Sequence, residues 1–159
     1  AVPKARHVPH FGYVSLFPLL MRVLPVDSPR LGALLLQLND TKLLWTPAGL
    51  RSLAASSSLY RQYNTEHDPP YWRGQIWMNI NYLALSALRH YSDQPGPHME
   101  HAAEVHAALQ AALTQNVVHQ YRTRGYLFEQ YDDVNGKGTS SHPFTGWTAL
   151  ITLIATGTY

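Results

Sequence analysis

Apolar residues recur at spacings of three and four positions over much of this chain, which is the spacing of one buried face of a helix. The pattern predicts helices over residues 12–24, 29–38, 76–91 and 98–122. A final apolar segment, residues 147–155, predicts a helix that is buried on several sides. No segment alternates convincingly enough for a strand, so the sequence predicts an all-α fold.

Two long segments, residues 44–73 and 125–147, lack this periodic pattern. Connections in compact domains usually have about 4–6 residues, and longer ones are either disordered or functional. The aromatic and charged content of the first segment argues against disorder. Helix pairs with short turns at one end would place both segments at the other end, as at the rim of an α-helical toroid where a site is built.

Glu129 stands in the second segment, with Phe128 before it and Tyr131 shortly after it. An acid between aromatic rings is a candidate general acid or base, because apolar neighbours raise the pKa of a carboxyl group towards neutrality. The alternative is an exposed Glu in a turn. Turn-forming residues follow at 132–138, but the Ser, His, Pro and Phe after them are unusual in a simple solvated connection, which favours a functional segment.

Residues 66–74, with the sequence EHDPPYWRG, bring two acids, a histidine, two aromatic rings and an arginine together. A carbohydrate site uses this mixture, because aromatic rings stack on the C–H faces of sugars and planar charged groups hold the hydroxyls. The alternative is a helix cap in which Trp72 only packs. Two such segments in one short chain favour a binding site.

Composition narrows the class of protein. The chain has 159 residues, enough for one domain. Charged residues make up only 14% of it, against about 25% in typical globular domains, which indicates a large buried area or surfaces that face a missing partner. The net charge of +2, without any run of Lys or Arg, argues against nucleic-acid binding. No apolar run approaches the ~20 residues that span a bilayer.

Nine histidines raise the question of a metal site. Neither His98 with His101 nor His7 with His10 has a third ligand at a recognisable spacing, so no metal is expected. The chain has no cysteine, which excludes disulfides and Cys-based zinc sites. No Gly-rich phosphate loop is present, and no organic cofactor is expected. Residues 39–41 (NDT) form a possible N-glycosylation sequon, which matters only in a secretory protein.

The chain resembles a known family in four segments: LRSLAASSSLY, EHDPPYWRGQIWMNINYLAL, GYLFEQYDD and HPFTGWTALI. They are similar to the C-terminal part of the processing α-glucosidase I family, the mannosyl-oligosaccharide glucosidases of glycoside hydrolase family 63. The resemblance covers essentially the whole chain. More distantly, EQYD followed by an aromatic-Gly-Trp helix start is similar to the clan that includes trehalases and glucoamylases.

This resemblance implies an (α/α)6 barrel, of which residues 1–159, as a single segment, would supply roughly the C-terminal half. It implies an inverting exo-α-glucosidase that removes the outermost α-1,2-linked glucose from the Glc3Man9GlcNAc2 N-glycan precursor in the lumen of the endoplasmic reticulum. The implied partners are this glucosylated high-mannose glycan and the N-terminal remainder of the same enzyme. Any membrane attachment would come from an anchor outside this chain.

By motif match, Glu129 would be the general base. Five residues would line the glucose pocket: Tyr71, Trp72, Arg51, His67 and Phe128. Inverting hydrolysis also needs a general acid ~6.5–9.5 Å from the base, and no segment here matches the part of the family that carries it. Four acids are candidates by chemistry alone: Glu66, Asp68, Asp132 and Asp133. We therefore expect the isolated chain to be inactive.

Three alternatives remain open. In the first, the chain is a glycan-binding module that kept the pocket and lost the acid. In the second, it is a helical scaffold in which both long segments only pack. In the third, it is part of another hydrolase of the clan, such as a trehalase-like or glucoamylase-like enzyme. Turnover separates the enzymes from the binding module, and sugar binding separates both from the scaffold.

Overall fold

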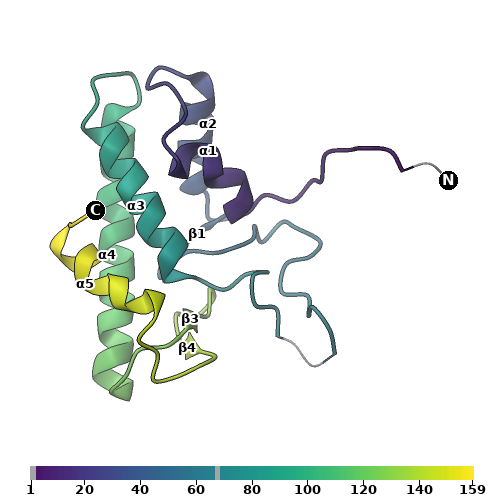
Figure 1. The fold of residues 1–159 in the computed structure, drawn as a ribbon, viewed down its shortest axis with the longest axis vertical. Helices are drawn as coiled ribbons and strands as arrows, with labels where there is room; N and C mark the ends of the chain where they lie inside the picture. Colours follow the sequence, from purple (N-terminus) through teal and green to yellow (C-terminus); the bar gives the residue numbers. More distant parts are fainter. Residues whose placement is uncertain (1–2, 67–68) are drawn as a thin grey trace.

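The computed structural model describes residues 3–66 and 69–159. Its core is a pair of long helices, α3 (Met78–Ser92) and α4 (Met99–Arg124), which pack side by side (Figure 1). Both predicted helices are confirmed, with ends within two residues of the predicted ones. Gly125 ends α4, because its left-handed φ of 85° turns the chain out of the helix.

The apolar residues whose spacing predicted these two helices form the interface between them. α4 buries a row at spacings of three and four: Ala102, Val105, Leu109, Leu113 and Val117. α3 buries Ala84, Leu85 and Leu88. Each fully buried Leu or Val contributes about 1.5–3 kcal/mol relative to an exposed one. Among the described residues, no helix has the length and hydropathy needed to cross a membrane.

The first N-terminal helix is shorter than predicted, and the second has the predicted bounds. A 3₁₀ helix, η1 (Tyr13–Leu16), leads into α1 (Phe17–Leu20), and α2 (Pro29–Leu38) follows. The prediction of one helix over residues 12–24 is therefore wrong. The chain leaves the helix after Leu20, and Arg22 has a φ of 56°, which no right-handed helix accommodates. α2 begins as expected, with the Ser28 side chain accepting a hydrogen bond from the N–H of Arg30.

The C-terminal helix is less buried than predicted. It consists of a 3₁₀ helix, η2 (Trp147–Leu150), and α5 (Ile151–Thr156), which lies across α4 (Figure 1). Only Ile151 and Ile154 of α5 are buried. The expectation of burial on several sides is wrong, because α5 packs through a single face and Leu153 on the opposite side is exposed.

Two small antiparallel hairpins correct the all-α prediction. β1 (Trp45–Thr46) pairs with β2 (Gly49–Leu50), and β3 (Gln130–Tyr131) pairs with β4 (Gly138–Thr139). The fold is thus predominantly helical with small sheets. Strands of two residues are too short to produce a detectable alternation.

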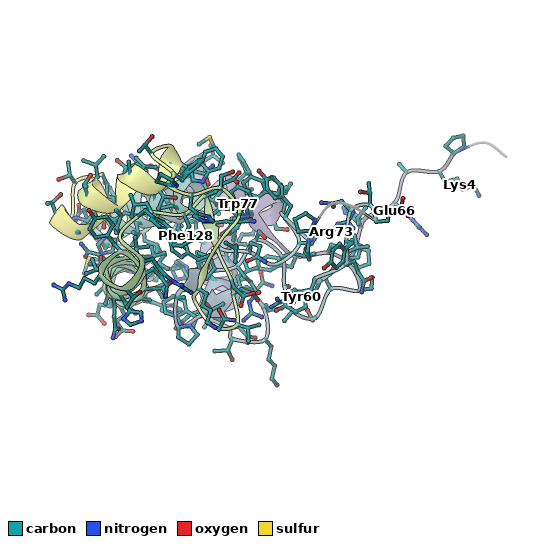
Figure 2. The ribbon with its side chains drawn as sticks, turned by 90° about the horizontal axis from the view of Figure 1, so that it is seen from below. Lys4, Tyr60, Glu66, Arg73, Trp77 and Phe128 are labelled. Carbon is teal, nitrogen blue, oxygen red and sulfur yellow. The ribbon has the colours of Figure 1, made fainter. Side chains whose placement is uncertain are left out.

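Ile76 joins the two long segments. It pairs with Arg51 on one side and with Tyr131 on the other. The N–H of Ile76 donates to the Tyr131 carbonyl oxygen at 2.8 Å, and the N–H of Tyr131 donates back at 3.0 Å. The segments at 44–73 and 125–147 therefore lie side by side, as the sequence predicted for one rim. Figure 2 shows the loop of Tyr60, Glu66 and Arg73 projecting from the helical body on the side where Lys4 lies.

Asn81 is the polar centre of this junction and is fully buried. Its Oδ1 accepts from the Leu50 N–H at 2.8 Å. Its amide nitrogen lies at hydrogen-bond distance from the Tyr13 hydroxyl, 3.0 Å, and from the Trp77 carbonyl oxygen, 2.8 Å. One side chain of α3 thereby fixes two distant segments, at Tyr13 and Leu50, to the start of its own helix.

We expect Asn81→Ala to lower the free energy of unfolding of the chain by about 2–3 kcal/mol, because a buried donor at Leu50 is left without a partner. Urea unfolding followed by tryptophan fluorescence measures this. Asn79→Ala is the control on the same helix, since among the described residues the Asn79 side chain hydrogen-bonds only to the neighbouring Ile80 N–H. Equal losses in the two variants would contradict the role of Asn81.

Candidate active site

The carboxylate of Glu129 is held at both oxygens. The Tyr71 hydroxyl donates to Oε1 at 2.6 Å, and the Ser141 N–H donates to Oε2 at 3.3 Å. The residue is 8% exposed, so the carboxylate is almost enclosed by protein. Tyr71 comes from the first long segment and Glu129 from the second, so the contact exists only because the fold brings them together.

The main chain around Glu129 is also fixed. Its N–H donates to the Ser141 carbonyl oxygen at 3.0 Å, and its own carbonyl oxygen accepts from the Trp147 indole N–H at 2.7 Å. The Thr148 hydroxyl donates to the preceding carbonyl oxygen, that of Phe128, at 2.6 Å. The start of η2 therefore holds the segment just before β3 that carries the acid, which gives the carboxylate a defined direction.

The environment of Glu129 corrects one expectation. Burial raises the pKa of its carboxyl group, but hydrogen bonds from Tyr71, Ser140 and Ser141 outweigh burial and hold the pKa below its usual value. The apolar surroundings do raise the pKa, but these donors reverse the net shift, so the pKa does not move towards neutrality. The acid is consequently ionised at neutral pH, which is the form that accepts a proton.

Aromatic rings gather beside this carboxylate. Trp72 stacks on Trp77 with ring centroids 3.8 Å apart and planes within 10°, and Tyr71 meets the same Trp77 edge to face at 4.6 Å. Trp147 lies 5.6 Å from Trp77. We call Tyr71, Trp72, Trp77 and Trp147 the aromatic cluster. Trp77 is fully buried, whereas Trp72 is 44% exposed and lines a hollow of ≈ 390 Å³.

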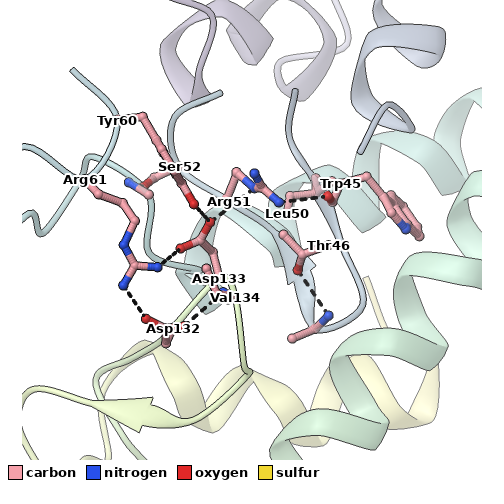
Figure 3. A network of polar contacts seen from close by, with 12 residues as sticks. Trp45, Thr46, Leu50, Arg51, Ser52, Tyr60, Arg61, Asp132, Asp133 and Val134 are labelled. Carbon is pink, nitrogen blue, oxygen red and sulfur yellow. Dashed lines mark hydrogen bonds and ion pairs between the residues drawn. The ribbon is translucent and has the colours of Figure 1, made fainter. Parts of the chain in front are cut away.

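A buried ion-pair network lies on the other side of the junction (Figure 3). The Asp133 side chain is fully buried and contacts Arg51 Nε at 3.3 Å and an Arg61 nitrogen at 3.2 Å. It also accepts from the Tyr60 hydroxyl at 2.5 Å. Arg61 reaches Asp132 at 2.9 Å. These five residues, the Asp133 network, tie the first long segment to the end of β3.

The pKa values of the two acids of this network are shifted in opposite directions. Burial raises the pKa of Asp133, and the hydrogen bond from Tyr60 and the charges of Arg51 and Arg61 only partly offset it. The pKa of Asp132 is also raised by burial, but the N–H groups of residues 135 and 134 and the Arg61 side chain bring it below its usual value. Asp132 is therefore an ionised turn residue, and Asp133 is a costly buried charge.

The structure brings together part of the predicted site. Tyr71 contacts Glu129, and Trp72 lies in the aromatic cluster. Arg51 is paired with Asp133, and its role in binding glucose stays a prediction. His67 and Asp68 lie outside the described residues.

Phe128 lies inside the fold and is 5% exposed. Its ring covers Gly138 so closely that a Cβ there would stand 2.0 Å from ring carbon Cδ2. The ring also contacts Tyr126 and His142. Phe128 thus packs the hairpin that carries Glu129, and its place in the glucose pocket stays a prediction.

Sequence reasoning did not single out Trp77, Trp147 or Ser141 as part of the site. Trp77 lay within the helix predicted over residues 76–91, and Trp147 began the helix predicted over residues 147–155. The available signal was the presence of a tryptophan shortly after YWRG and another directly after TG. Trp147 and Ser141 reach Glu129 only through the fold, from 18 and 12 positions away. Within residues 3–66 and 69–159, no group of three His, Cys, Asp or Glu residues is arranged to hold a metal ion.

Comparison with known proteins places this geometry in a family. The model of the glycosyl hydrolase family 63 C-terminal domain matches residues 1–157. The chain belongs to glycoside hydrolase family 63. It is similar to mannosyl-oligosaccharide glucosidase GCS1 of Arabidopsis thaliana, with 49% identity over 99% of this chain and 18% of that protein.

A second family 63 relative, the probable mannosyl-oligosaccharide glucosidase of Schizosaccharomyces pombe, is 40% identical over 96% of this chain and 18% of its own length. The chain thus spans about a fifth of the curated relatives it matches. Among solved structures, it is similar in fold to the family 63 mannosylglycerate hydrolase from Thermus thermophilus in complex with glucose, with a TM-score of 0.65 and 20% identity. That match covers 93% of this chain and 32% of the other.

Proposed function

We propose that this chain forms the C-terminal half of an (α/α)6 catalytic barrel and that the longer protein, the parent enzyme, is an inverting exo-α-glucosidase. Its substrate would be the triglucosylated high-mannose N-glycan precursor, from which it removes the terminal α-1,2-linked glucose. One observation carries this proposal: an ionised Glu129 carboxylate fixed by Tyr71 and Ser141 beside an aromatic cluster. The relatives named mannosyl-oligosaccharide glucosidase support the choice of substrate.

In this mechanism Glu129 is the general base. It removes a proton from a water molecule while the water oxygen attacks the anomeric carbon. The bond from that carbon to the leaving oxygen breaks, and a general acid protonates the leaving oxygen. Inversion follows, because attack and departure take place on opposite faces of the sugar ring.

The general acid is proposed to lie outside this chain. Asp133 is fully buried and already paired with two arginines, so it has no path to a leaving group. Asp132 is bonded to Arg61 and to main-chain N–H groups that lower its pKa, the opposite of what an acid needs. The N-terminal remainder of the parent enzyme is therefore the proposed partner that supplies the acid.

The sugar pocket is proposed to use the exposed ring of Trp72, with Arg51 and His67 as polar partners and with Phe128 shaping its wall. An aromatic face stacks on the C–H surface of glucose, and planar charged groups bind hydroxyls. The solved Thermus thermophilus hydrolase is in complex with glucose, which is consistent with a glucose-sized pocket in this fold. The same chemistry requires neither a metal nor an organic cofactor.

The proposed location is the lumen of the endoplasmic reticulum, where the precursor glycan is processed, with any membrane anchor outside this chain. Asn39, the first residue of the possible sequon, is exposed at the end of α2. The relatives' names support this location only through the glycan they act on.

A second substrate class follows from one comparison. A curated mannosylglycerate hydrolase from Thermus thermophilus is 29% identical over 54% of this chain, so a small glycoside belongs among the substrates to be tested. Trehalose represents the wider clan. A glycan-binding module without turnover would bind the triglucosylated glycan but would release no sugar from that glycan, from a small glycoside or from trehalose.

We expect the parent enzyme to release glucose from the triglucosylated oligosaccharide and the isolated 159-residue chain to release none, because the general acid is proposed to lie outside the chain. Glucose release at equal molar concentrations measures this, with circular dichroism to show that the isolated chain is helical. Turnover by the isolated chain would place the acid within it. Binding by the parent enzyme without turnover would favour the glycan-binding module.

A further inference from the structure

We propose that Tyr71 positions the general base and is not a wall of the glucose pocket. The phenol of Tyr71 holds Oε1 of Glu129. The contact is short, 2.6 Å from the Tyr71 hydroxyl to Oε1. The inference rests on the proposed function, in which Glu129 is the base. It changes the part played by Tyr71 from touching the sugar to acting through Glu129.

The backbone directs this ring. Tyr71 has a φ of 49°, a left-handed conformation that costs about 1–3 kcal/mol for a residue other than Gly and persists only where the surroundings enforce it. Its carbonyl oxygen accepts from the Trp77 indole N–H at 3.4 Å, and its ring packs edge to face on that indole. Trp77 is fully buried and held by its packing, so it provides a fixed surface against which the Tyr71 ring packs.

The two oxygens of Glu129 have different partners. Oε2 accepts from the Ser141 N–H, and residues 140 and 141 also provide hydroxyl donors to the carboxylate. Oε1 receives the phenol of Tyr71. Each carboxylate oxygen has about two acceptor sites, and the Tyr71 phenol takes one of those on Oε1. Tyr71 thereby fixes the direction in which the base faces the attacking water.

The proton stays on Tyr71 throughout. The hydrogen bond to Glu129 comes first, with burial next, in raising the pKa of Tyr71 to about 12. The neutral phenol is therefore a donor at every pH at which the enzyme would act, and a donor favours the ionised carboxylate. When water transfers its proton to Glu129, the phenol keeps its own hydrogen, so Tyr71 takes no part in the proton balance.

The chain contains a matched control. Tyr60 also donates a short hydrogen bond to a carboxylate, 2.5 Å to Asp133 Oδ2. That carboxylate is already paired with Arg51 and Arg61. Tyr60→Phe therefore removes the same group from the same kind of bond, in a network without Glu129.

The experiment measures kcat and kcat/KM of the parent enzyme against pH, with the triglucosylated oligosaccharide as substrate. For Tyr71→Phe, we expect kcat to fall by about 10–100-fold and the acidic limb of kcat/KM to move upwards by about 1–2 pH units, the size of a lost hydrogen bond to a charged group. The direction follows because loss of the donor raises the pKa of Glu129. KM should change little, and Tyr60→Phe should leave the acidic limb in place.

A second variant covers the case in which Tyr71→Phe does not fold. Site-specific 3-fluorotyrosine at position 71 keeps the ring and makes the phenol a stronger donor, so the acidic limb should move downwards. A higher KM with kcat and the acidic limb unchanged would make Tyr71 a pocket wall and overturn the inference. Unchanged turnover in Glu129→Gln would instead overturn the proposed function, and with it the base that Tyr71 positions.

Discussion

Glu129→Gln in the parent enzyme is expected to lower turnover by roughly 10²–10⁴-fold or more, while binding of the glycan is kept. Gln has nearly the same shape as Glu, but its amide does not accept a proton from water. Tyr71 and Ser141 still find a hydrogen-bond partner there, so the surrounding loop should stay in place. Glucose release from the triglucosylated oligosaccharide measures the effect, and circular dichroism checks the fold.

The control for this variant is Glu104→Gln, an exposed acid on α4 that lies outside both long segments. It should leave kcat and KM unchanged. If Glu129→Gln also left turnover unchanged, the base would have to be elsewhere, most directly on the loop that carries Glu66. The segment from 125 to 147 would then be purely structural.

Asp133→Ala is expected to lower the free energy of unfolding by about 3–5 kcal/mol, the usual cost of removing one partner from a buried ion pair. The cost does not come from losing a strong attraction, because burial holds the pKa of Asp133 above its usual value and the pair gives little net stability. It comes from Arg51, whose side chain is 12% exposed and would lose its counter-charge. Urea unfolding of the chain measures the loss.

Asp93→Ala is the matched control for burial. Arg89 and Asp93 form an ion pair at 2.9 Å, comparable in length to the contacts of Asp133, but their side chains are 58% and 56% exposed. Exposed pairs of this kind contribute about 0.3–0.5 kcal/mol. If the two variants destabilised the chain equally, burial of Arg51 would not be the cause.

The sequence predicted the long helices well because their residues interact locally. The buried row of α4, such as Leu109 and Leu113, repeats with the helical period, and that period is visible without knowledge of the fold. It failed for the helix expected over residues 12–24. There the apolar spacing continues past Arg22, although the backbone turns at that residue.

The candidate site was predicted in part for a different reason. Glu129 and the YWRG aromatic residues were found through their composition and through the resemblance to family 63, not through any geometry. The sequence did not fix the net pKa shift of Glu129, because it shows Phe128 and Tyr131 beside it but not the three donors that reach its carboxylate. Sequence neighbours indicate burial, whereas hydrogen-bond donors arrive from other segments.

The sequence by itself determined the family, the two long helices and the two irregular segments that carry the chemistry, because these depend on motifs and on periodicity within single stretches. Only the tertiary structure decided that Tyr71 hydrogen-bonds to Glu129, 58 positions away in the sequence, and that Arg51 forms an ion pair with Asp133. Both contacts depend on the pairing of Ile76 with its neighbours on either side. Such long-range pairings are selected by the free energy of the whole packed core, which no local pattern encodes.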